Sequence, residues 1–462
     1  MSLFHRKSIL GFLVVGLVVS PEPAYAGSGD VYGYGSRASA LGNTLLGGSN
    51  GAYATFYNPA ANSARPGVGL SLAAAYAHPK FKEIHGVTIE NSATTAQGGT
   101  VTGDVDTEGY LDHLSQAVGF SYNFGEKWRS LALGILGSMP LGRFSYLDTG
   151  EPFKPEYYNY RATTQRPELF ASLGFAAARS LHAGAGVKFA ANVASSANYT
   201  VSGSAGTVSH GRMTTTVKPS AAPYVSVFYD PKYDAPSHPS PSWTCALTVR
   251  APARYRLDVD VRSNARVLGP TNDFPIVFDS SSTLYYDPLE ADLAASLEPA
   301  PRWWITLELD WLNTSAYQAP TVSVVDTGSA IQLKNSVSST PSMRDIFVPK
   351  LGVERRWNAT TARAGYFWRP SPITDNSGSG NLVDPEKHVF TAGVGFDLKK
   401  ARVSERAIVV DLHGQYHWLV SQRITKSPGN EAGSAGQGKV GSPGYDIGGA
   451  VYGGGLSVSM LF

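Results

Sequence analysis

Short stretches in which apolar and polar residues alternate fill most of the chain beyond residue 67. The stretch 450–462 has one apolar face, and its other face is mostly glycine and serine. Alternation with period two is typical of a β-strand whose two faces meet different surroundings. Because this strand ends on the aromatic Phe462, we expect it to close a transmembrane β-barrel, with Phe462 in the aromatic girdle at the membrane surface. An ordinary soluble strand is the alternative.

The same alternation predicts thirteen earlier strands, so the expected fold class is all-β, a 14-stranded antiparallel transmembrane barrel. In the seventh strand, residues 243–262, the parity is kept across Pro252, which allows a local break. The earlier strands lie near residues 70–76, 118–122, 131–135, 169–175, 187–193, 225–229, 243–262, 291–297, 303–311, 351–356, 362–368, 390–398 and 408–418.

Two further features favour a membrane barrel over a soluble sandwich. Aromatic residues stand at the ends of the apolar faces, where interfacial girdles place them. They are Tyr76, Tyr122, Trp303, Trp311, Trp368 and Trp418. Long and short connections also alternate, as in outer-membrane barrels with both termini periplasmic. The long ones are 77–114, 139–166, 194–222, 262–288, 313–346, 369–388 and 419–449, and the short ones include 123–130, 177–184, 298–302, 358–360 and 399–406.

Residues 1–26 are expected to be a secretory signal peptide. A basic start at residues 5–7 precedes an apolar core at 9–19, and Ala-Tyr-Ala at 24–26 fits a cleavage site. The chain has one cysteine, Cys245, so export brings no intrachain disulfide. No later segment reaches the ~18 apolar residues that a helical membrane span needs. We therefore expect the exported chain in the outer membrane.

Residues 27–66 differ in amino-acid composition from the strands that follow. They are rich in Gly, Ala, Ser and Asn, with a short helix expected within 38–46. Phe56 and Tyr57 beside Asn58-Pro59 indicate a packed turn rather than disorder. A compact segment of this kind in a barrel protein is expected to fill the lumen as a plug, or hatch. The expected organisation is a signal peptide (1–26), a plug (27–66) and a barrel (67–462).

Few patterns in the chain indicate chemistry. The string at 47–51 matches G-x-S-x-G but lacks the strand before it and the helix after it that a nucleophile elbow needs. His413 and His417 share one strand face without further metal ligands. Glu308 and Asp310 also share a face, where inward cations favour an internal ion-pair network over a catalytic carboxylate pair. Those cations are Arg250, Arg254, Arg256, Lys350, Arg356 and Arg363.

The net charge of the chain argues against one class of function, nucleic-acid binding. Lys and Arg total 38 and Asp and Glu total 36, which gives a formal net charge of +2 at pH 7. That balance lacks the basic excess of nucleic-acid-binding proteins. We expect no catalytic residues, no metal and no cofactor.

The plug and several strand segments resemble one known family, the FadL-type outer-membrane transporters. Gly35-Ser-Arg-Ala-Ser-Ala-Leu-Gly42 followed by Ala54-Thr-Phe-Tyr-Asn-Pro-Ala-Ala61 is similar to the family's hatch. Similar segments then follow in order through most of the chain, at residues 137–142, 297–311, 349–354, 363–372 and 387–396. An acidic residue usually precedes the hatch aromatics, but Asn50-Gly51 stands there in this chain, so its hatch hydrogen bonds are expected to differ.

The resemblance implies passive uptake of hydrophobic molecules, most of all long-chain fatty acids, with aromatic hydrocarbons carried in the TodX branch. It implies that Asn58, Pro59 and Ala60 form the hatch motif. It also implies lateral release at a kinked third strand, which we place at Gly134, Gly137 and Pro140 because Gly and Pro weaken strand pairing.

The expected partners of such a barrel are its hydrophobic substrates, outer-membrane lipid and lipopolysaccharide, and the barrel-assembly machinery, with the protein itself a monomer. A structural or adhesin barrel and a barrel lipid hydrolase are the alternatives.

Overall fold

The computed structural model describes residues 28–48, 51–64, 67–90, 101–105, 110–125, 128, 130–142, 155–160, 164–202, 207–231, 242–266, 273–317, 323–326, 341–376, 381–426, 439–441 and 443–462. The expected signal peptide, residues 1–26, lies outside this range.

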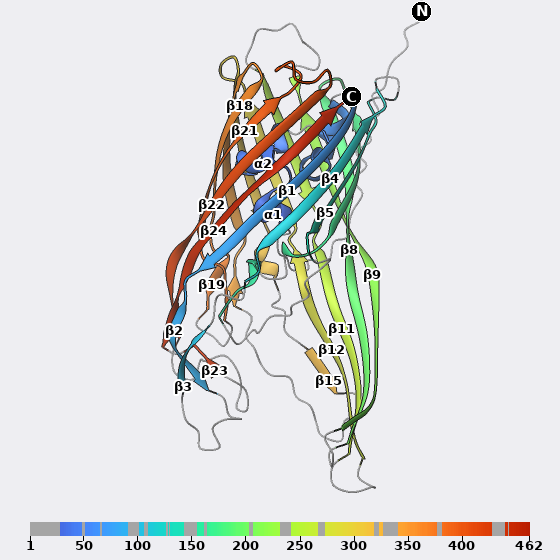
Figure 1. The fold of residues 1–462 in the computed structure, drawn as a ribbon, viewed down its shortest axis with the longest axis vertical. Coiled ribbons are helices and arrows are strands. Elements are labelled where there is room, and N and C mark those ends of the chain that lie inside the picture. Colours follow the sequence, from blue (N-terminus) through green and yellow to red (C-terminus); the bar gives the residue numbers. More distant parts are fainter. Residues whose placement is uncertain are drawn as a thin grey trace, which may run out of the picture.

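Fourteen antiparallel strands form one closed ring (Figure 1). Each strand pairs with the next, and the last, β24, pairs with both β22 and the first, β1. The ring consists of β1 (Gly67–Phe81), β4 (His113–Asn123), β5 (Ala132–Pro140), β7 (Glu168–Ala176), β8 (Leu181–Ser202), β9 (Thr207–Tyr229), β10 (Trp243–Arg250), β13 (Glu290–Leu297), β14 (Trp303–Leu312), β17 (Ile346–Trp357), β18 (Thr360–Arg369), β21 (Lys387–Asp397), β22 (Ala407–Thr425) and β24 (Gly444–Leu461). This confirms the predicted fold class and strand count.

The two faces of the wall differ as the alternation predicts. Outward side chains are large and apolar, and Leu72, Leu293 and Leu307 each expose more than half of their surface. Inward positions such as Thr248 and Glu354 are polar and buried. A soluble protein rarely leaves so wide a belt of exposed apolar side chains, so the belt indicates a wall that spans a membrane. Separately, no helix in the described part of the chain is long and apolar enough to cross a membrane, a finding that says nothing about a β-barrel.

The ring has short turns at one end and long extensions at the other, as outer-membrane barrels have at their periplasmic and extracellular ends. The extensions are partly strands, which corrects two expectations. Residues 194–222, expected as a loop, mostly continue the β8–β9 hairpin. The strand expected at 243–262 ends at Arg250 because Pro252 cannot donate a ladder hydrogen bond. The chain resumes as β11 (Ala253–Arg266), which leaves the ring and pairs with β12 (Asp273–Asp287) and, in parallel, with β8.

Smaller elements lie in the other long connections. Buried aromatic rings pack among some of them: the rings of Phe81 and Tyr157 stack at 4.1 Å, and Tyr110 and Tyr160 belong to the same cluster. The smaller elements are β2 (Ile84–Glu90), β3 (Val101–Val105), β6 (Glu156–Tyr157), η4 (Tyr158–Tyr160), η7 (Thr314–Ala316), β15 (Ser323–Asp326), β16 (Ser342–Met343), β19 (Ile373–Asp375), β20 (Leu382–Val383) and β23 (Lys439–Val440).

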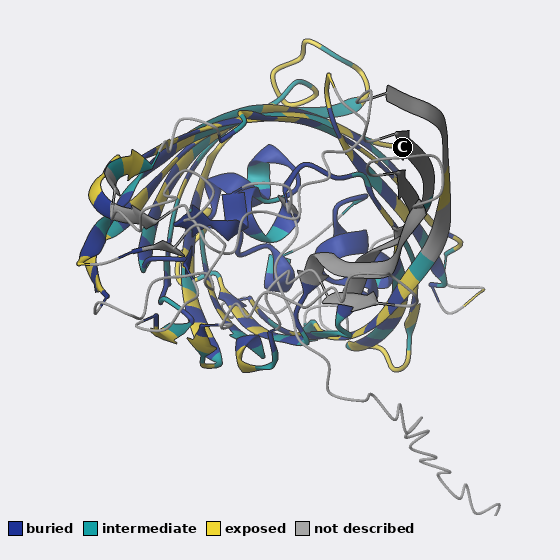
Figure 2. Cartoon of the chain, turned by 90° about the horizontal axis from the view of Figure 1, so that it is seen from below, coloured by how far each residue is buried: buried dark blue, intermediate teal, exposed yellow. Residues whose placement is uncertain are grey.

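The described residues of the N-terminal segment, 28–48 and 51–64, lie inside the ring (Figure 2). They form α1 (Ser28–Tyr32), α2 (Ser36–Ala40), η1 (Leu46–Gly48), α3 (Ala54–Tyr57) and η2 (Pro59–Ala64). Inward hydroxyl groups bind the backbone of this plug: Ser457 Oγ accepts from Ser36 N at 3.1 Å, and Ser226 Oγ accepts from Ala60 N at 2.9 Å. Thr391 Oγ1 donates to Ala40 O at 2.9 Å. These contacts satisfy plug polar groups that are shielded from water.

The plug touches the wall most closely where the wall carries glycine. A methyl group added at any of these glycines would overlap plug atoms, so a larger residue there requires the plug or the wall to move. The wall glycines are Gly119, Gly134, Gly174, Gly184, Gly352, Gly365 and Gly393. Because they come from β4, β5, β7, β8, β17, β18 and β21, the plug is fixed around most of its circumference.

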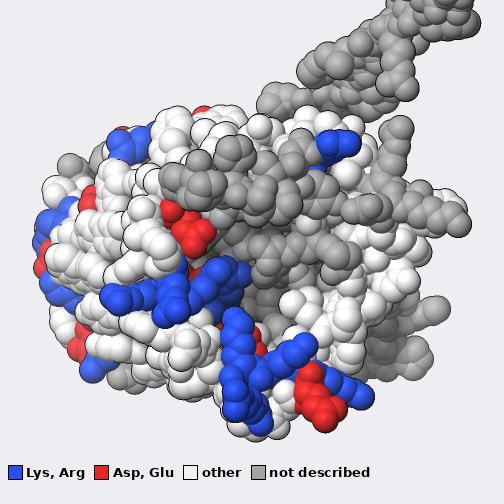
Figure 3. Space-filling model, turned by 90° about the horizontal axis from the view of Figure 1, so that it is seen from above, with Lys and Arg blue, Asp and Glu red and all other residues white. Residues whose placement is uncertain are grey.

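Lys and Arg gather on part of the periplasmic end (Figure 3). Arg355 also packs on the outer surface there, with its guanidinium 4.6 Å from the Trp303 ring and 4.9 Å from the Trp357 ring. Such a pairing of Arg with exposed Trp suits the membrane interface. The exposed cations include Arg302, Arg355, Arg356, Lys399, Lys400, Arg402 and Arg406.

Candidate functional site

A small cavity, of about 40 Å³, lies between the plug and the wall. Its apolar lining comes from both sides, with Leu46, Phe56 and Tyr57 on the plug and Leu312, Val348 and Phe367 on the wall. Its charged lining is almost entirely on the wall. An apolar surface with a few converging polar groups is typical of a small-molecule site.

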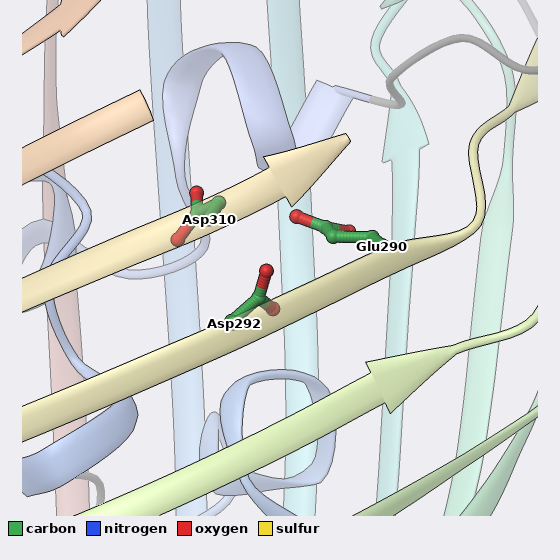
Figure 4. Close-up of side chains that lie close together, drawn as sticks. All are labelled: Glu290, Asp292 and Asp310. Atoms are coloured by element: carbon green, nitrogen blue, oxygen red, sulfur yellow. The ribbon is translucent and has the colours of Figure 1, made fainter. Parts of the chain in front are cut away.

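One charged group in the cavity is a cluster of carboxylates on β13 and β14 (Figure 4). Lys350 Nζ lies 3.0 Å from Glu308 Oε1 and 2.5 Å from Asp310 Oδ2. Arg250 binds Asp292 Oδ2 and lies 3.3 Å from Glu290 Oε2. The predicted ion-pair network is therefore present at Arg250, Glu308, Asp310 and Lys350.

The network extends to other inward residues and to the plug. Arg363 binds Glu354 Oε2 at 2.7 Å and Asp411 Oδ1 at 2.6 Å, while Arg37 of the plug binds the same Glu354 oxygen at 3.1 Å. Arg356 also contacts Glu354. The side chains of residues 254 and 256, expected in the network, lie outside the described part of the structure.

A plug carboxyl also reaches the cavity. Asp30 on α1 is partly buried, and this burial raises the pKa of its carboxyl to about 7. The neighbouring Glu290 carboxylate adds to the rise.

A second charged group lies beside the apolar wall of the cavity. Arg369 Nη1 binds Asp384 Oδ2 at 2.9 Å, and Lys387 Nζ lies 3.9 Å from Asp384 Oδ1 and 3.0 Å from the Tyr160 hydroxyl. Two basic side chains thus share one carboxylate. Buried apolar side chains stand next to this group, namely Leu312, Ile346, Val348, Phe367 and Val389.

An aromatic cluster continues from the cavity toward β5 and β7. Phe56 lines the cavity and also packs against Phe170 of β7, with ring centroids 5.2 Å apart. Leu136 of β5, fully buried, belongs to the same cluster, as do Tyr34 and Tyr57. The apolar lining of the cavity is therefore continuous with the inner face of these two strands.

The three residues of the predicted hatch motif follow one another where α3 has its C-cap at Asn58 and η2 begins at Pro59. Asn58 Nδ2 donates to Leu46 O at 3.2 Å, which ties α3 to η1. Pro59 and Ala60 approach the wall where Gly174 and Gly184 leave room for them. This arrangement is local scaffolding of the plug, and a functional role for Asn58, Pro59 and Ala60 stays a prediction.

The three residues expected at a strand kink lie on β5, and the pairing there is not interrupted. β5 pairs with β4 from Ala132 to Pro140 and with β7 from Ala132 to Ser138, without a register shift. Pairing therefore continues through Gly134 and Gly137, and a kink at Gly134, Gly137 and Pro140 stays a prediction. Their lack of a side chain has other uses: Gly134 makes room for the plug, and a methyl group at Gly137 would reach only Leu169, at 3.8 Å.

Other candidates from the sequence are placed away from any reactive arrangement. His417 is buried and its Nε2 lies 2.9 Å from Gln415 Oε1. Phe462 is exposed on the outer surface, where its ring lies 5.8 Å from the Arg406 guanidinium. Part of the 47–51 string falls outside the described residues.

A second and larger cavity, of about 320 Å³, opens at the periplasmic side of the plug. Arg37, Glu354, Arg363 and Asp411 line it together with serines and backbone. This polar lining suits water rather than an oily solute.

The sequence did not single out Glu290, Asp292, Arg369 or Lys387. Glu290 and Asp292 alternate with Ala291 and Leu293, so strand parity marks them as inward. Parity does not show which inward residues of different strands meet, because that depends on the stagger of the ring.

Neither a protein-family model nor a curated protein sequence matches this chain. Solved structures do match. A FadL homologue from Pseudomonas aeruginosa is 13% identical, with a TM-score of 0.59 over 95% of this chain and 98% of that one. The toluene transporter TodX from Pseudomonas putida is 12% identical, with a TM-score of 0.51 over 96% of this chain and 100% of that one. The likeness shows a shared fold.

Proposed function

We propose that this chain, which has the fold of the FadL- and TodX-type outer-membrane transporters, takes up hydrophobic molecules with an anionic head, most of all long-chain fatty acids. The observation that carries the proposal is the position of two basic side chains, Arg369 and Lys387, which share Asp384, beside an apolar wall in one cavity. A carboxylate head suits the cations, and a hydrocarbon tail suits the wall. An aromatic hydrocarbon carries no charged group that could pair with these basic side chains.

A lined path is needed because oily chains are poorly soluble in water. Moving a buried hydrocarbon tail into water costs about 0.8 kcal/mol for each CH₂ group. The apolar cluster that contains Phe56, Leu136 and Phe170 continues the apolar surface from the cavity to the wall. The periplasmic side of the plug offers a polar cavity instead.

We infer that release is lateral, between β5 and β7. The pairing of these strands ends at Ser138, two residues before β5 itself ends, whereas β4 pairs with β5 as far as Pro140. The pairing of β5 with β7 is thus shorter than its pairing with β4. Because the hydrogen-bonded pairing of β5 with β7 is continuous from Ala132 to Ser138, release requires these two strands to separate locally.

The head-group assignment can be tested by calorimetry on the detergent-purified protein. Removing both cations, in the Arg369→Met/Lys387→Met variant, is expected to weaken oleate binding at least tenfold and to leave oleyl alcohol binding unchanged. Hydrogen bonds to a charged group contribute about 1.5–3 kcal/mol, and 1.4 kcal/mol corresponds to a factor of ten. Lys399→Met/Arg402→Met, which removes the same charge from the periplasmic end, serves as the control.

Two results would contradict the proposal. Equal loss of oleate and oleyl alcohol would mean that the cations support the cavity rather than bind the head. Equal uptake of labelled oleate by cells with and without the gene would favour a structural or adhesin barrel.

A further inference from the structure

Three carboxylates converge on one point of the wall beside the plug. Glu290 and Asp292 lie on β13 and Asp310 on the adjacent β14, where Asp292 and Asp310 are cross-strand partners (Figure 4). One oxygen from each lies within 4.8 Å of the other two, and all three side chains are buried. Two oxygens on opposite sides of Ca²⁺, each ~2.4 Å from it, are ~4.8 Å apart, so one Ca²⁺ can reach all three. Mg²⁺, with bonds of ~2.1 Å, would need a tighter group.

The neighbouring cations do not complete this cluster. Four wall carboxylates, Glu290, Asp292, Glu308 and Asp310, face the two cations Arg250 and Lys350. The set keeps two formal negative charges in excess, in a place where uncompensated charge is costly. One divalent cation supplies the missing charge.

Specific oxygens are also left without donors. Arg250 and Lys350 bind the Oδ2 atoms of Asp292 and Asp310. The Oδ1 atoms of both residues are fully buried and have no hydrogen-bond donor among the described residues. Buried acceptors are normally satisfied, so an unfilled pair points to a bound species.

The plug supplies a further, independent acceptor. The side chain of Asn43 is 4% exposed and lines the same cavity, and its Oδ1 atom finds no donor in the described part of the chain. Asp30 of α1 also lines this cavity. Carboxylate and carboxamide oxygens are the protein ligands that Ca²⁺ prefers, and it takes six to eight of them, water included.

We propose that Glu290, Asp292 and Asp310 bind one Ca²⁺ ion at the plug–wall boundary, in the cavity that Asn43 and Asp30 of the plug also line. Such an ion would join β13 and β14 to the plug beside the substrate cavity. The proposal does not depend on the identity of the transported molecule, since the ligands are separate from Arg369 and Lys387.

The site can be tested on the full chain, purified in detergent and freed of metal with EDTA. Titration with CaCl₂ in a calorimeter is expected to show one binding event, and TbCl₃ is expected to give luminescence sensitised by Tyr57, which lines the same cavity. Asp310→Asn and Glu290→Gln are each expected to weaken Ca²⁺ binding at least tenfold. Asp446→Asn, at an exposed carboxylate far along the extracellular end of β24, is expected to change nothing.

Either of two results would overturn the site. One is the absence of a binding event in the unaltered protein at millimolar Ca²⁺, which would leave protons as the species that neutralise the cluster. The other is unchanged affinity in Glu290→Gln, a variant of nearly identical shape whose folding can be verified by its heat-modifiable mobility in gels. Neither outcome would bear on oleate binding, so the two proposals fail separately.

Discussion

Uptake of labelled oleate is expected to fall to background when β5 and β7 are joined by a disulfide in a Gly137→Cys/Leu169→Cys variant. These residues are direct cross-strand partners, and both face outward, away from the plug and the cavity. Directly opposed residues in an antiparallel pair have Cα atoms ~4.5–5.5 Å apart, within the range of a disulfide. A covalent link at the end of the β5–β7 ladder prevents the separation that lateral release requires. The measurement is uptake by intact cells before and after reduction, and reduction is expected to restore it.

The cross-link needs two controls. The native Cys245 is replaced by Ser in all variants, so that only the new pair can react. Leu307→Cys/Leu351→Cys places an equivalent outward pair on β14 and β17, on a different part of the ring, and is expected to leave uptake unchanged. If uptake survives the link at β5 and β7, the substrate leaves by another route.

Replacing Gly365 with Leu is expected to displace the plug and to open the barrel to ions. A side chain at Gly365 of β18 would overlap the plug backbone at Leu41 and Gly42, and backbone atoms cannot rotate out of the way. The expected result is a large rise in single-channel conductance in planar bilayers, together with a lower melting temperature. Conductance is the sharper measure, because the wall can stay folded while the plug shifts.

Gly414 provides the matched position for this test. It also lies on a wall strand, β22, but a methyl group there would meet only Gly453 O, at 3.9 Å. Gly414→Ala is therefore expected to keep the conductance of the unaltered protein. If a folded Gly365→Leu barrel had the same low conductance as the unaltered protein, the plug would be able to accommodate a larger side chain at this position without being displaced.

The strands were predictable because one simple rule governs them. A lipid-facing wall requires apolar side chains at every second position. The outward orientation of Leu293, Leu307 and Leu412 can therefore be predicted from the sequence. The strand at residue 243 was predicted too long because β11 keeps the same alternation after it has left the ring. The alternation of apolar and polar residues predicts a strand with two different faces, but it does not predict which strands pair with it.

The candidate site was harder to predict for the same reason. Asp292 and Asp310 are recognisable as inward residues, but their closeness to Glu290, Lys350 and the plug follows from the stagger of four separate elements. Gly134 and Gly137 were interpreted as weak points in β5, when their nearest neighbours are the plug and Leu169. A glycine in a strand is equally consistent with a break and with a close approach, and only the three-dimensional structure separates the two.

The double pairing of β24, with β22 on one side and β1 on the other, sets the order in which the protein can assemble. Until β24 is in place, two strand edges remain open, and both invite incorrect association. Once it is in place, the plug is enclosed by a continuous wall that leaves no clearance at Gly365 or Gly184. We therefore expect the plug to be seated before the last strand arrives, because a closed wall with no clearance at these glycines would resist its later entry.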